Sequence, residues 1–408
     1  MLNKKFLEDF MNRFIAFLIC LFIGLNYFSA IVYASVDEGE LNINENNNEA
    51  ENANSLEINA KSAVLMDAET GMVLYTKNAV EPLAPASVTK IMTLLLVAEA
   101  IENEVISLED KVLVSANAAS MGGSQIFTKE GEEFTVEELL KSTVIASAND
   151  AAVALAETVS GSESAFVEKM NSRAKELGMT NTNFENATGL DDTVTNHVTS
   201  AYDIALMSRE LIKYDIITAY SCVWQDSIRD GEFILTNTNR LVRYYDGCTG
   251  LKTGSTDKAG FCVSATAKRD GMHLIAVVMG AETRDERNNA ARAMLDFGFS
   301  NYALYSEPET ELEDVDVLRG TVDNIAVYSS SFTKLISKAD KKKIEKEYTI
   351  PETLSAPLKS GDVVGSIVYK LNGEIVGKSD VFVKDDVVEI KVGTLFARIL
   401  KTIFTGKY

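Results

Sequence analysis

The chain has 408 residues, of which 46% are hydrophobic and 24% are charged. This composition is typical of a folded protein with a sizeable core, and it excludes a wholly disordered, collagenous or coiled-coil chain. The 39 Lys and Arg against 60 Asp and Glu give a net charge of −21, which repels nucleic acid because no basic patch in the body of the chain offsets it. Two His and four Cys cannot form a CxxC…CxxC or HExxH motif, so no metal and no other cofactor is expected.

The N-terminus has the pattern of a secretory signal peptide. Basic residues precede an apolar run from Phe14 to Leu25, and the sequence Val32–Ser35 follows at the position of a cleavage site. We therefore predict cleavage after Ala34, which leaves an exported chain with a net charge of −22. A retained anchor is the alternative, but Asn26 and Ser29 interrupt the apolar run before it can span a hydrocarbon core of about 30 Å.

The segment from residue 35 to 56 contains seven Asn and six acidic residues but no Lys or Arg. Its few apolar positions cannot bury enough surface to offset the entropy of folding. The segment is therefore predicted to be a disordered tether.

Three cysteines, Cys222, Cys248 and Cys262, remain after removal of the signal peptide. An odd number of thiols cannot all pair within the chain. We predict three buried thiols that behave as small hydrophobic side chains, with one disulfide plus a free thiol as the alternative.

Strand patterns stand at both ends of a helix-rich segment between residues 57 and 305. Residues 62–67 and 72–77 are β-rich runs at the spacing of a hairpin, and residues 260–267 and 273–279 flank an Asp-Gly turn. This order differs from strict βαβ alternation. It predicts an α+β fold in which one antiparallel sheet is covered by helices.

Beyond Pro308 the helical pattern gives way to β-branched stretches, and residues 308–392 are predicted to form a small β-rich C-terminal domain. Residues 363–369 and 375–376 flank the turn residues Asn372 and Gly373, and Lys341–Lys343 is predicted to be a solvated loop.

A nucleophile and a base are suggested by the sequence Pro85–Lys90. The following residues, 88–100, are apolar on nearly every face and predict a buried helix, with Ser87 and Lys90 on one face of its first turn. A desolvated lysine loses pKa and can act as a base toward a serine hydroxyl, which would make a nucleophile without histidine. The alternative is that Ser87 caps the helix and Lys90 extends to solvent.

Two further motifs complete the set. Ser147 and Asn149 lie at the break between two helical stretches, residues 136–143 and 151–159, and Lys252-Thr253-Gly254 precedes the second pair of strands. Each motif alone also fits a cap or a polar loop. Together, SxxK, SxN and KTG are the set found in penicillin-binding proteins and class A β-lactamases.

In acyl transfer each motif serves a different step. Ser87 attacks a carbonyl while Lys90 takes its proton. Ser147 relays a proton to the leaving amine, and Asn149 hydrogen-bonds the substrate amide. Lys252 and Thr253 hold a substrate carboxylate, and Gly254 lets an extended peptide approach the strand.

The sequence resembles the low-molecular-mass penicillin-binding proteins that are serine-type D-alanyl-D-alanine carboxypeptidases (peptidase family S11), from about residue 57 to 408. The resemblance is carried by these motifs and by longer stretches: residues 66–71, 187–192, 197–203 and 280–283, followed by Arg287. It implies a β-lactamase/transpeptidase-like sheet, a β-rich C-terminal domain and acylation by β-lactams. It also implies release of the terminal D-Ala from peptidoglycan stem peptides, with Arg287 helping to hold the terminal carboxylate. Ser255 departs from the family pattern, because a larger His or Tyr more often follows KTG.

Three alternatives use the same residues. A class A β-lactamase would need an extra Glu for deacylation, and Glu185 is the one acidic residue in a suggestive place. An endopeptidase or transpeptidase would differ only in the leaving group or acceptor, and a catalytically idle cell-wall binding protein would keep the fold alone. His197 and His273 are predicted to be structural, since Lys90 fills the role of the base.

The last segment, Thr394–Tyr408, has apolar residues at helical spacing with Arg398, Lys401 and Lys407 between them. At about 1.5 Å per residue it is too short to cross a membrane, so we predict an amphipathic helix that lies on an anionic membrane surface. The alternative is a helix that docks on the β-rich domain. The sequence therefore predicts an exported protein at the outer face of the cytoplasmic membrane.

Overall fold

The computed structural model describes residues 56–192 and 194–405. The predicted signal peptide and, apart from Leu56, the predicted tether lie outside the described residues. The catalytic motifs and both predicted pairs of strands lie within them.

A five-stranded antiparallel sheet forms the centre of the first part of the chain. Its strands lie in the order β2-β1-β9-β8-β7, and its hydrogen-bonded neighbours are antiparallel throughout. The predicted hairpins are confirmed as β1 and β2 and as β8 and β9, and a third strand, β7, carries the KTG motif at the edge of the sheet. The bounds are Ser62–Asp67 for β1, Val73–Lys77 for β2, Cys248–Thr256 for β7, Gly260–Arg269 for β8 and Met272–Ala281 for β9.

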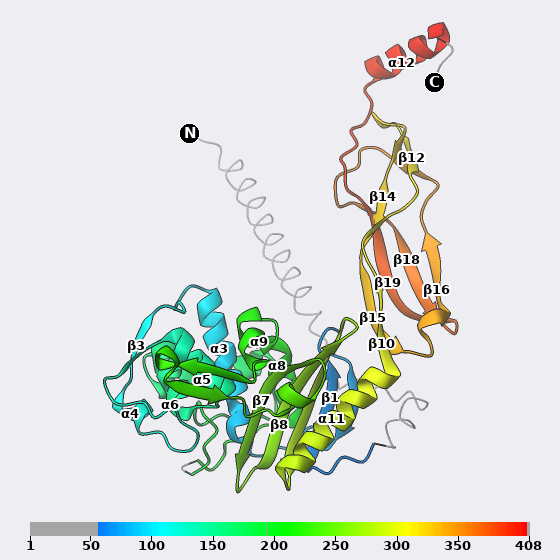
Figure 1. Cartoon of the computed structure of the whole chain (residues 1–408). Helices are drawn as coiled ribbons and strands as arrows, with labels where there is room; N and C mark the ends of the chain where they lie inside the picture. Colours follow the sequence, from blue (N-terminus) through cyan, green and yellow to red (C-terminus); the bar gives the residue numbers. More distant parts are fainter. Residues whose placement is uncertain (1–55, 193, 406–408) are drawn as a thin grey trace, which may run out of the picture. The chain divides into compact units, whose positions relative to one another are not determined.

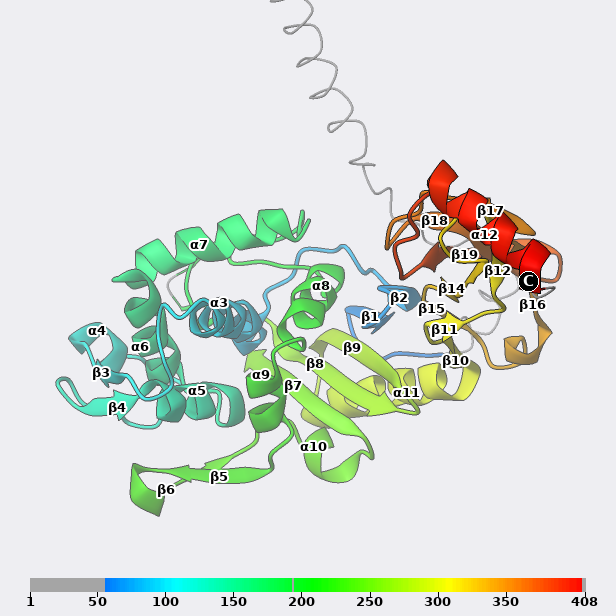
Figure 2. The ribbon, with the colours of Figure 1, turned by 90° about the horizontal axis from the view of Figure 1, so that it is seen from above.

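Helices cover both faces of this sheet (Figures 1 and 2). Alternate residues of β1 explain why. Ala63 and Leu65 point into the apolar cluster with α11 (Arg284–Asn301), whereas Val64 and Met66 point into the other cluster, with α3 (Lys90–Glu102) and α8 (Ala201–Leu211). All four side chains are buried. The α+β fold with a covered antiparallel sheet is thus confirmed, and it fixes β7 as an edge strand beside the helical layer.

The buried helix predicted after Ser87 is present, but its start differs. Residues Ala86–Thr89 form a 3₁₀ turn, η1, and the α-helix α3 runs from Lys90 to Glu102 with ten of its thirteen residues buried. The helices predicted around Ser147 are α5 (Val136–Ile145), which opens with a capping box, and α6 (Asn149–Ser160).

Further elements complete this helical layer, and two small hairpins in it were not predicted. The additional helices are α4 (Ala116–Ala119), α7 (Glu163–Glu176), α8 (Ala201–Leu211), α9 (Asp215–Ser221), α10 (Leu241–Tyr244) and the 3₁₀ turn η2 (Arg229–Gly231). The hairpins pair β3 (Lys111–Leu113) with β4 (Glu133–Thr135) and β5 (Gln225–Ile228) with β6 (Phe233–Thr236).

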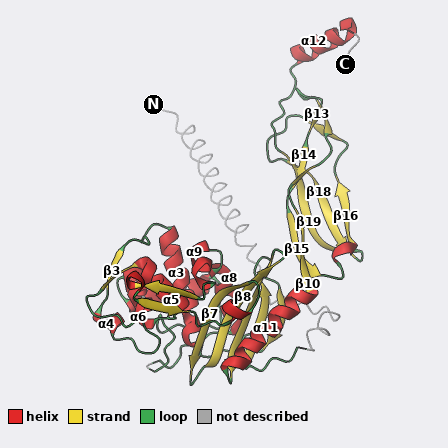
Figure 3. Ribbon diagram, in the orientation of Figure 1, coloured by secondary structure: helices red, strands yellow, loops and turns green. Residues whose placement is uncertain are grey.

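The chain after α11 is rich in strands (Figure 3). One sheet has the order β11-β14-β19-β18-β16, a second has the order β13-β12-β17, and β10 pairs with β15. The bounds are Tyr302–Glu307 (β10), Thr310–Glu311 (β11), Val315–Leu318 (β12), Asn324–Ile325 (β13), Val327–Ser329 (β14), Phe332–Ser337 (β15), Ile344–Thr349 (β16), Thr353–Ser355 (β17), Val363–Leu371 (β18) and Glu374–Val383 (β19). The predicted hairpin at Asn372 and Gly373 joins β18 to β19, and Lys341–Lys343 is an exposed 3₁₀ turn, η3.

The three described cysteines are free thiols. Cys262 is buried on β8, as predicted, and Cys248 is half-buried. The prediction of a buried thiol is wrong for Cys222, because this residue caps the C-terminal end of α9 at the surface.

The described part of the chain ends in the helix α12 (Val392–Thr405), where an amphipathic helix was predicted for Thr394–Tyr408; the last three residues of that prediction lie outside the described residues. Its described apolar side chains are exposed, and they recur about every four residues: Val392, Phe396, Leu400, Ile403 and Phe404. Within the described part of the chain, no helix is long and apolar enough to span a membrane.

Candidate active site

Ser87 and Lys90 lie on one side of η1, with Lys90 Nζ 2.9 Å from Ser87 Oγ. Ala86, immediately before the serine, has a φ of +49°, a conformation that non-glycine residues rarely adopt. Such strain is concentrated at functional sites, where the surrounding structure must hold it in place. The turn therefore presents the serine hydroxyl to the lysine amine.

Lys90 is fully buried, and its amine meets three oxygen atoms. Lys90 Nζ donates to Asn149 Oδ1 at 2.5 Å and to the carbonyl oxygen of Thr188 at 2.9 Å, and the third neighbour is Ser87 Oγ. Burial, together with the charge of Lys252, holds the pKa of Lys90 well below its ordinary value, while Asp150 acts in the opposite direction. A neutral amine has two N–H groups and one lone pair. Since Asn149 and Thr188 can accept both N–H groups, the lone pair is left for the hydroxyl proton of Ser87.

Ser147 occupies the turn between α5 and α6 with a φ of +63°, the second left-handed residue at the site. Its Oγ accepts a hydrogen bond of 2.7 Å from Lys252 Nζ, which also donates to the carbonyl oxygen of Thr253 at 3.0 Å. Burial, and secondarily the charge of Arg287, lowers the pKa of Lys252 to about 7. Lys252 can therefore both hold a charge and release a proton near neutral pH.

Asn149 is 2% exposed, and its side chain forms hydrogen bonds to two partners. In addition to accepting from Lys90, it donates from Nδ2 to the carbonyl oxygen of Gly122 at 2.6 Å. Its backbone N–H donates to the carbonyl oxygen of Ser124. Asn149 therefore ties α6, Lys90 and the loop at Gly122 together from behind the serine.

Gly254 lets β7 lie directly against η1. A Cβ atom at this position would come within 2.7 to 2.9 Å of the backbone nitrogens of Ser87 and Val88 and of the carbonyl oxygen of Pro85. These are backbone atoms, which cannot rotate away. Only glycine therefore permits the edge of the sheet to approach the serine this closely.

A groove of about 680 Å³ opens over the serine. Six of the nine residues predicted for the site line this groove: Ser87, Ser147, Thr253, Gly254, Ser255 and Arg287. The other three, Lys90, Asn149 and Lys252, are at most 2% exposed and lie behind it. The structure thus brings the three motifs together from η1, the α5–α6 turn and β7.

Arg287 projects from α11 into the groove although it is only 3% exposed. Its Nε and Nη2 atoms donate to Asn288 Oδ1 at 3.1 and 2.9 Å. Burial, followed by the neighbouring charge of Arg284, lowers the pKa of Arg287 to about 10, so the guanidinium stays charged at neutral pH.

Several groups at the site have no signature in the sequence. The carbonyl oxygen of Thr188 is a backbone atom, and Thr238 enters the site because its hydroxyl accepts from Thr253 Oγ1 at 2.8 Å. Trp224, Arg240 and Tyr244 line the groove from the unpredicted segment around β5, β6 and α10. For Thr188 the sequence did offer a signal, because the stretch 187–192 belongs to the family resemblance, but nothing in that stretch indicated a role at the site.

The two histidines make structural hydrogen bonds. His197 Nε2 lies 2.8 Å from Thr89 Oγ1, and its Nδ1 accepts from the backbone N–H of Glu185. His273 Nε2 lies 3.0 Å from Thr249 Oγ1. Burial lowers the pKa of both imidazoles to about 4, which keeps them neutral at pH 7. Across residues 56–192 and 194–405, no three His, Cys, Asp or Glu side chains gather in a way that could hold a metal ion.

Comparison with known proteins identifies the family of the chain. Residues 47–283 match the family described as D-alanyl-D-alanine carboxypeptidase, and residues 299–389 match the C-terminal domain of penicillin-binding protein 5. The chain belongs to the D-alanyl-D-alanine carboxypeptidase family. Its members are serine hydrolases and penicillin-binding proteins, as the sequence predicted.

Individual relatives align with most of this chain and with most of their own length. The chain is 47% identical over 349 residues to the D-alanyl-D-alanine carboxypeptidase DacF of Bacillus subtilis, which covers 84% of this chain and 89% of the relative. Penicillin-binding protein 5 of Haemophilus influenzae superposes with a TM-score of 0.69 at 30% identity, covering 82% of this chain and 98% of that one. The ampicillin-bound form of penicillin-binding protein D2 from Listeria monocytogenes superposes with a TM-score of 0.56 at 32% identity, covering 60% of this chain and 99% of that one.

Proposed function

We propose that the protein is a DD-carboxypeptidase that releases the terminal D-Ala from peptidoglycan pentapeptide stems through an acyl-enzyme on Ser87. The observation that carries this proposal is the environment of Lys90. Its buried amine has acceptors for both N–H groups, so its lone pair faces the hydroxyl of Ser87. The membership of the D-alanyl-D-alanine carboxypeptidase family supports the choice of substrate.

Acylation begins when Ser87 Oγ attacks the carbonyl carbon of the penultimate D-Ala and its proton passes to Lys90 Nζ. The backbone N–H of Ser87 and the free edge of β7 beside it stabilise the negative oxygen that forms. The C–N bond breaks as Ser147 gives a proton to the leaving amine, and Lys252 replaces that proton through its 2.7 Å hydrogen bond. Water then attacks the ester and gives a proton to Ser147 and Lys252, while Lys90 returns its proton to Ser87 Oγ, so the shortened peptide is released and the enzyme is restored.

Two of the predicted roles become more specific in this mechanism. Asn149 positions Lys90 through its Oδ1, and it keeps its predicted role toward the substrate amide because only one of its two Nδ2 N–H groups is used, by the carbonyl oxygen of Gly122. Lys252 acts through Ser147, since it lies behind the groove. Thr253 and Arg287, which line the groove, hold the terminal carboxylate, and Ser255 borders the peptide one residue beyond Gly254.

The test of the carboxypeptidase is to follow D-Ala release from a pentapeptide ending in D-Ala-D-Ala and from the same peptide with an amidated C-terminus. Release from the acid at a kcat/KM at least about tenfold above that of the amide is expected, because the amide removes the charge that Arg287 and Thr253 recognise. Equal cleavage of both peptides would contradict the carboxylate site, and no release from either would contradict the activity.

The proposal also includes acylation by β-lactams, which are carbonyl compounds that Ser87 can open in the same way. The ampicillin-bound structure of the Listeria relative supports this step. Incubation with ampicillin should raise the mass of the intact protein by one drug molecule. A catalytically idle cell-wall protein would keep its unmodified mass.

A β-lactamase is disfavoured by the position of Glu185. This residue is exposed, and its carboxylate accepts from the backbone N–H of Asn196 at 2.8 Å rather than lining the groove. No base for rapid deacylation is therefore supplied there. The ampicillin adduct should persist rather than turn over within seconds.

We also propose that the protein is exported through the signal peptide 1–34 and held at the outer face of the cytoplasmic membrane by α12. The exposed apolar side chains of α12 support this role, and its 14 residues extend only about 21 Å, which suits the membrane interface. Truncation after Gly393 should abolish binding to anionic liposomes at low salt. Equal binding by the truncated and the mature chain would contradict the anchor, and unfolding of the truncated chain would instead favour docking on the β-rich domain.

A further inference from the structure

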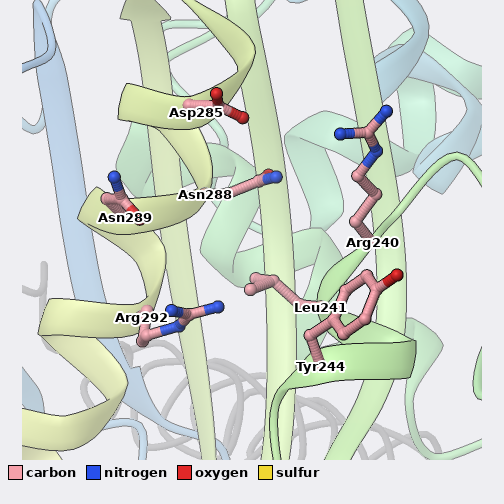
Figure 4. A pocket seen from close by; sticks show the side chains of 7 residues that line it. All are labelled: Arg240, Leu241, Tyr244, Asp285, Asn288, Asn289 and Arg292. Carbon is pink, nitrogen blue, oxygen red and sulfur yellow. The ribbon is translucent and has the colours of Figure 1, made fainter.

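Two of the three described thiols lie at the two ends of one segment that borders the groove. Cys222 is exposed and caps the C-terminal end of α9, and Cys248 is half-buried at the start of β7. We call the residues between them, 223–247, the wall segment, since several of them line the groove over Ser87. Its helix α10 also faces α11 across a second pocket of about 360 Å³ (Figure 4). A bond between the two cysteines would therefore link both ends of the wall segment.

The residues next to the two cysteines are in direct contact. Ser221 Oγ donates a hydrogen bond of 2.6 Å to the carbonyl oxygen of Thr249. The same serine packs so closely on Gly250 that a Cβ atom added to the glycine would lie 2.5 Å from Ser221 Oγ and 2.7 Å from Ser221 Cβ. The end of α9 and the start of β7 therefore lie side by side, with one cysteine on each backbone next to the contact.

The thiol of Cys248 is directed toward this contact. Its Sγ donates to the carbonyl oxygen of Gly250, the residue on which Ser221 packs, at 3.4 Å. Burial, and to a smaller extent the charge of Cys222, raises the pKa of Cys248 to about 11, while a backbone hydrogen bond at Gly250 acts in the opposite direction. Because charges interact strongly only at short range, this influence agrees with the contact between the neighbouring residues.

We propose that Cys222 and Cys248 form an intramolecular disulfide when the chain meets a disulfide oxidant, which links α9 to β7 across the wall segment. Disulfides persist outside the reducing cytosol, so in the cell this inference rests on the export proposed above.

The bond forms by two thiol–disulfide exchanges. The exposed thiolate of Cys222 attacks one sulfur atom of the oxidant, and the first thiol leaves. The thiol of Cys248 then gives its proton to water and attacks Cys222 Sγ, and the second thiol leaves. Two protein thiols are oxidised to one disulfide, and the disulfide of the oxidant is reduced to two thiols.

The bond should stabilise the folded chain. A cross-link between residues 222 and 248 restricts the unfolded chain, and this effect grows with the length of the segment that it closes. Since Ser221 already contacts Thr249 and Gly250 in the thiol form, the cysteines can join without moving α9 away from β7. Oxidation is therefore expected to raise the temperature at which the protein unfolds.

The experiment treats the folded mature chain, residues 35–408, with oxidised glutathione and then alkylates the remaining thiols in denaturant. Peptide mapping without reductant should show a bond between Cys222 and Cys248, with the buried Cys262 as the one alkylated cysteine. The thermal midpoint of unfolding should rise by about 5 °C or more, and dithiothreitol should reverse this rise.

Three variants separate the two exchanges. Cys248→Ser should stop at a glutathione adduct on Cys222, because no second thiol can displace it. Cys222→Ser should remain unmodified, since the half-buried Cys248 does not meet the oxidant first. Cys262→Ala keeps both partners and is the matched control, which should form the same bond as the wild type.

Other results would overturn the pairing. A wild-type chain that stays unmodified, keeps a glutathione adduct on Cys222, or joins a second chain through Cys222 would show that Cys248 is not its partner. A bond between Cys222 and Cys248 that lowers the thermal midpoint would show that the folded chain must distort to form it. None of these readouts depends on export or on D-Ala release, so failure of the pairing is distinct from failure of the proposed function.

Discussion

The region that carries Ser87 and the β-rich region after α11 differ in where their charged side chains lie: the first buries several of them, and the second keeps them at the surface. From residue 56 to 301, Lys90, Lys252 and Arg287 are at most 3% exposed, and among the described residues none of them forms an ion pair. From 302 to 391, the buried polar side chains are two serines, no charged side chain is buried, and ion pairs such as Lys346–Glu307 lie partly in solvent.

The difference shows which buried charges the fold requires. An unpaired buried cation costs several kcal/mol, and the apolar core of the β-rich region forms without one. Buried carboxylates in the first region are held by backbone N–H groups, as Asp150 is by Ile126 and Thr128, so they anchor loops. The two lysines donate hydrogen bonds to uncharged oxygen atoms, but no carboxylate pairs with either of them among the described residues. They are retained because burial lowers their pKa toward the range in which an amine can exchange protons.

The largest expected effect is that of Ser87→Ala. Removal of the nucleophile should lower D-Ala release by at least about 10⁴-fold and abolish the ampicillin adduct, since the remaining groups position the substrate but cannot form the acyl-enzyme. Ser300→Ala, an exposed serine of α11, is the control and should keep full activity. An adduct mapped to Ser147 in the Ser87→Ala variant would show that the nucleophile is misassigned.

Replacing the base should cost nearly as much. In Lys90→Arg the guanidinium remains protonated and cannot accept the hydroxyl proton, so acylation should slow by about 10³-fold. The acylation rate with ampicillin, measured by rapid-quench mass spectrometry, checks this directly. Activity within tenfold of the wild type would mean that the base lies elsewhere, and circular dichroism would show whether the larger head group fits at all.

The close approach of the sheet to η1 predicts a smaller but still severe effect for Gly254→Ala. The added methyl would meet three backbone atoms within 3 Å, so β7 must move away from Ser87, at a cost of about 1–3 kcal/mol of unfolding free energy. We expect kcat to fall by about 10²-fold, since the geometry around the reacting carbonyl is lost. Gly393→Ala in α12, where a Cβ meets nothing within 4 Å, is the matched control in the second region. Full activity in Gly254→Ala would show that the sheet edge takes no part.

Much of this comparison could be predicted from the sequence, and what could not has physical causes. The hairpins at Asp270-Gly271 and Asn372-Gly373, the buried helix after Ser87 and the grouping of the three motifs depend on local turn chemistry and apolar periodicity, which are visible in a sequence. The carbonyl of Thr188 and the bonds that commit Asn149 to Lys90 depend on the packing of distant segments. The same holds for the burial of Arg287 and for the exposure of Cys222, which is decided by where α9 ends.

The buried lysines also predict how stability depends on pH. The pKa of Lys252 is about 7 in the folded protein and about 10.4 when unfolded, so between these values the unfolded chain binds the additional proton. The unfolding free energy should therefore rise with pH across this window. Lys252→Met removes the contribution, and its advantage over the wild type should be largest at pH 6.5 and shrink at pH 9. Lys268→Met, an exposed control, should show no such trend in urea unfolding. An advantage that grows with pH would contradict the lowered pKa.

The smallest effect is expected where charges lie at the surface of the β-rich region. Lys346 and Glu307 are 2.7 Å apart with both side chains 31% exposed, and the hydrogen bonds from Lys346 and Tyr305 hold the pKa of Glu307 below its usual value. Because the pKa of Glu307 is lower in the folded than in the unfolded protein, its carboxylate stabilises the fold fully at pH values above the unfolded pKa. This stabilisation is lost as the pH falls through the pKa of the folded protein. Solvent screens the pair, so a double-mutant cycle of Glu307→Gln and Lys346→Met should give a coupling below about 1 kcal/mol at pH 7. The coupling should diminish by pH 3.5, with D-Ala release unchanged in every variant. A coupling of several kcal/mol would mean that this pair behaves as a buried one, and the contrast between the two regions would no longer hold.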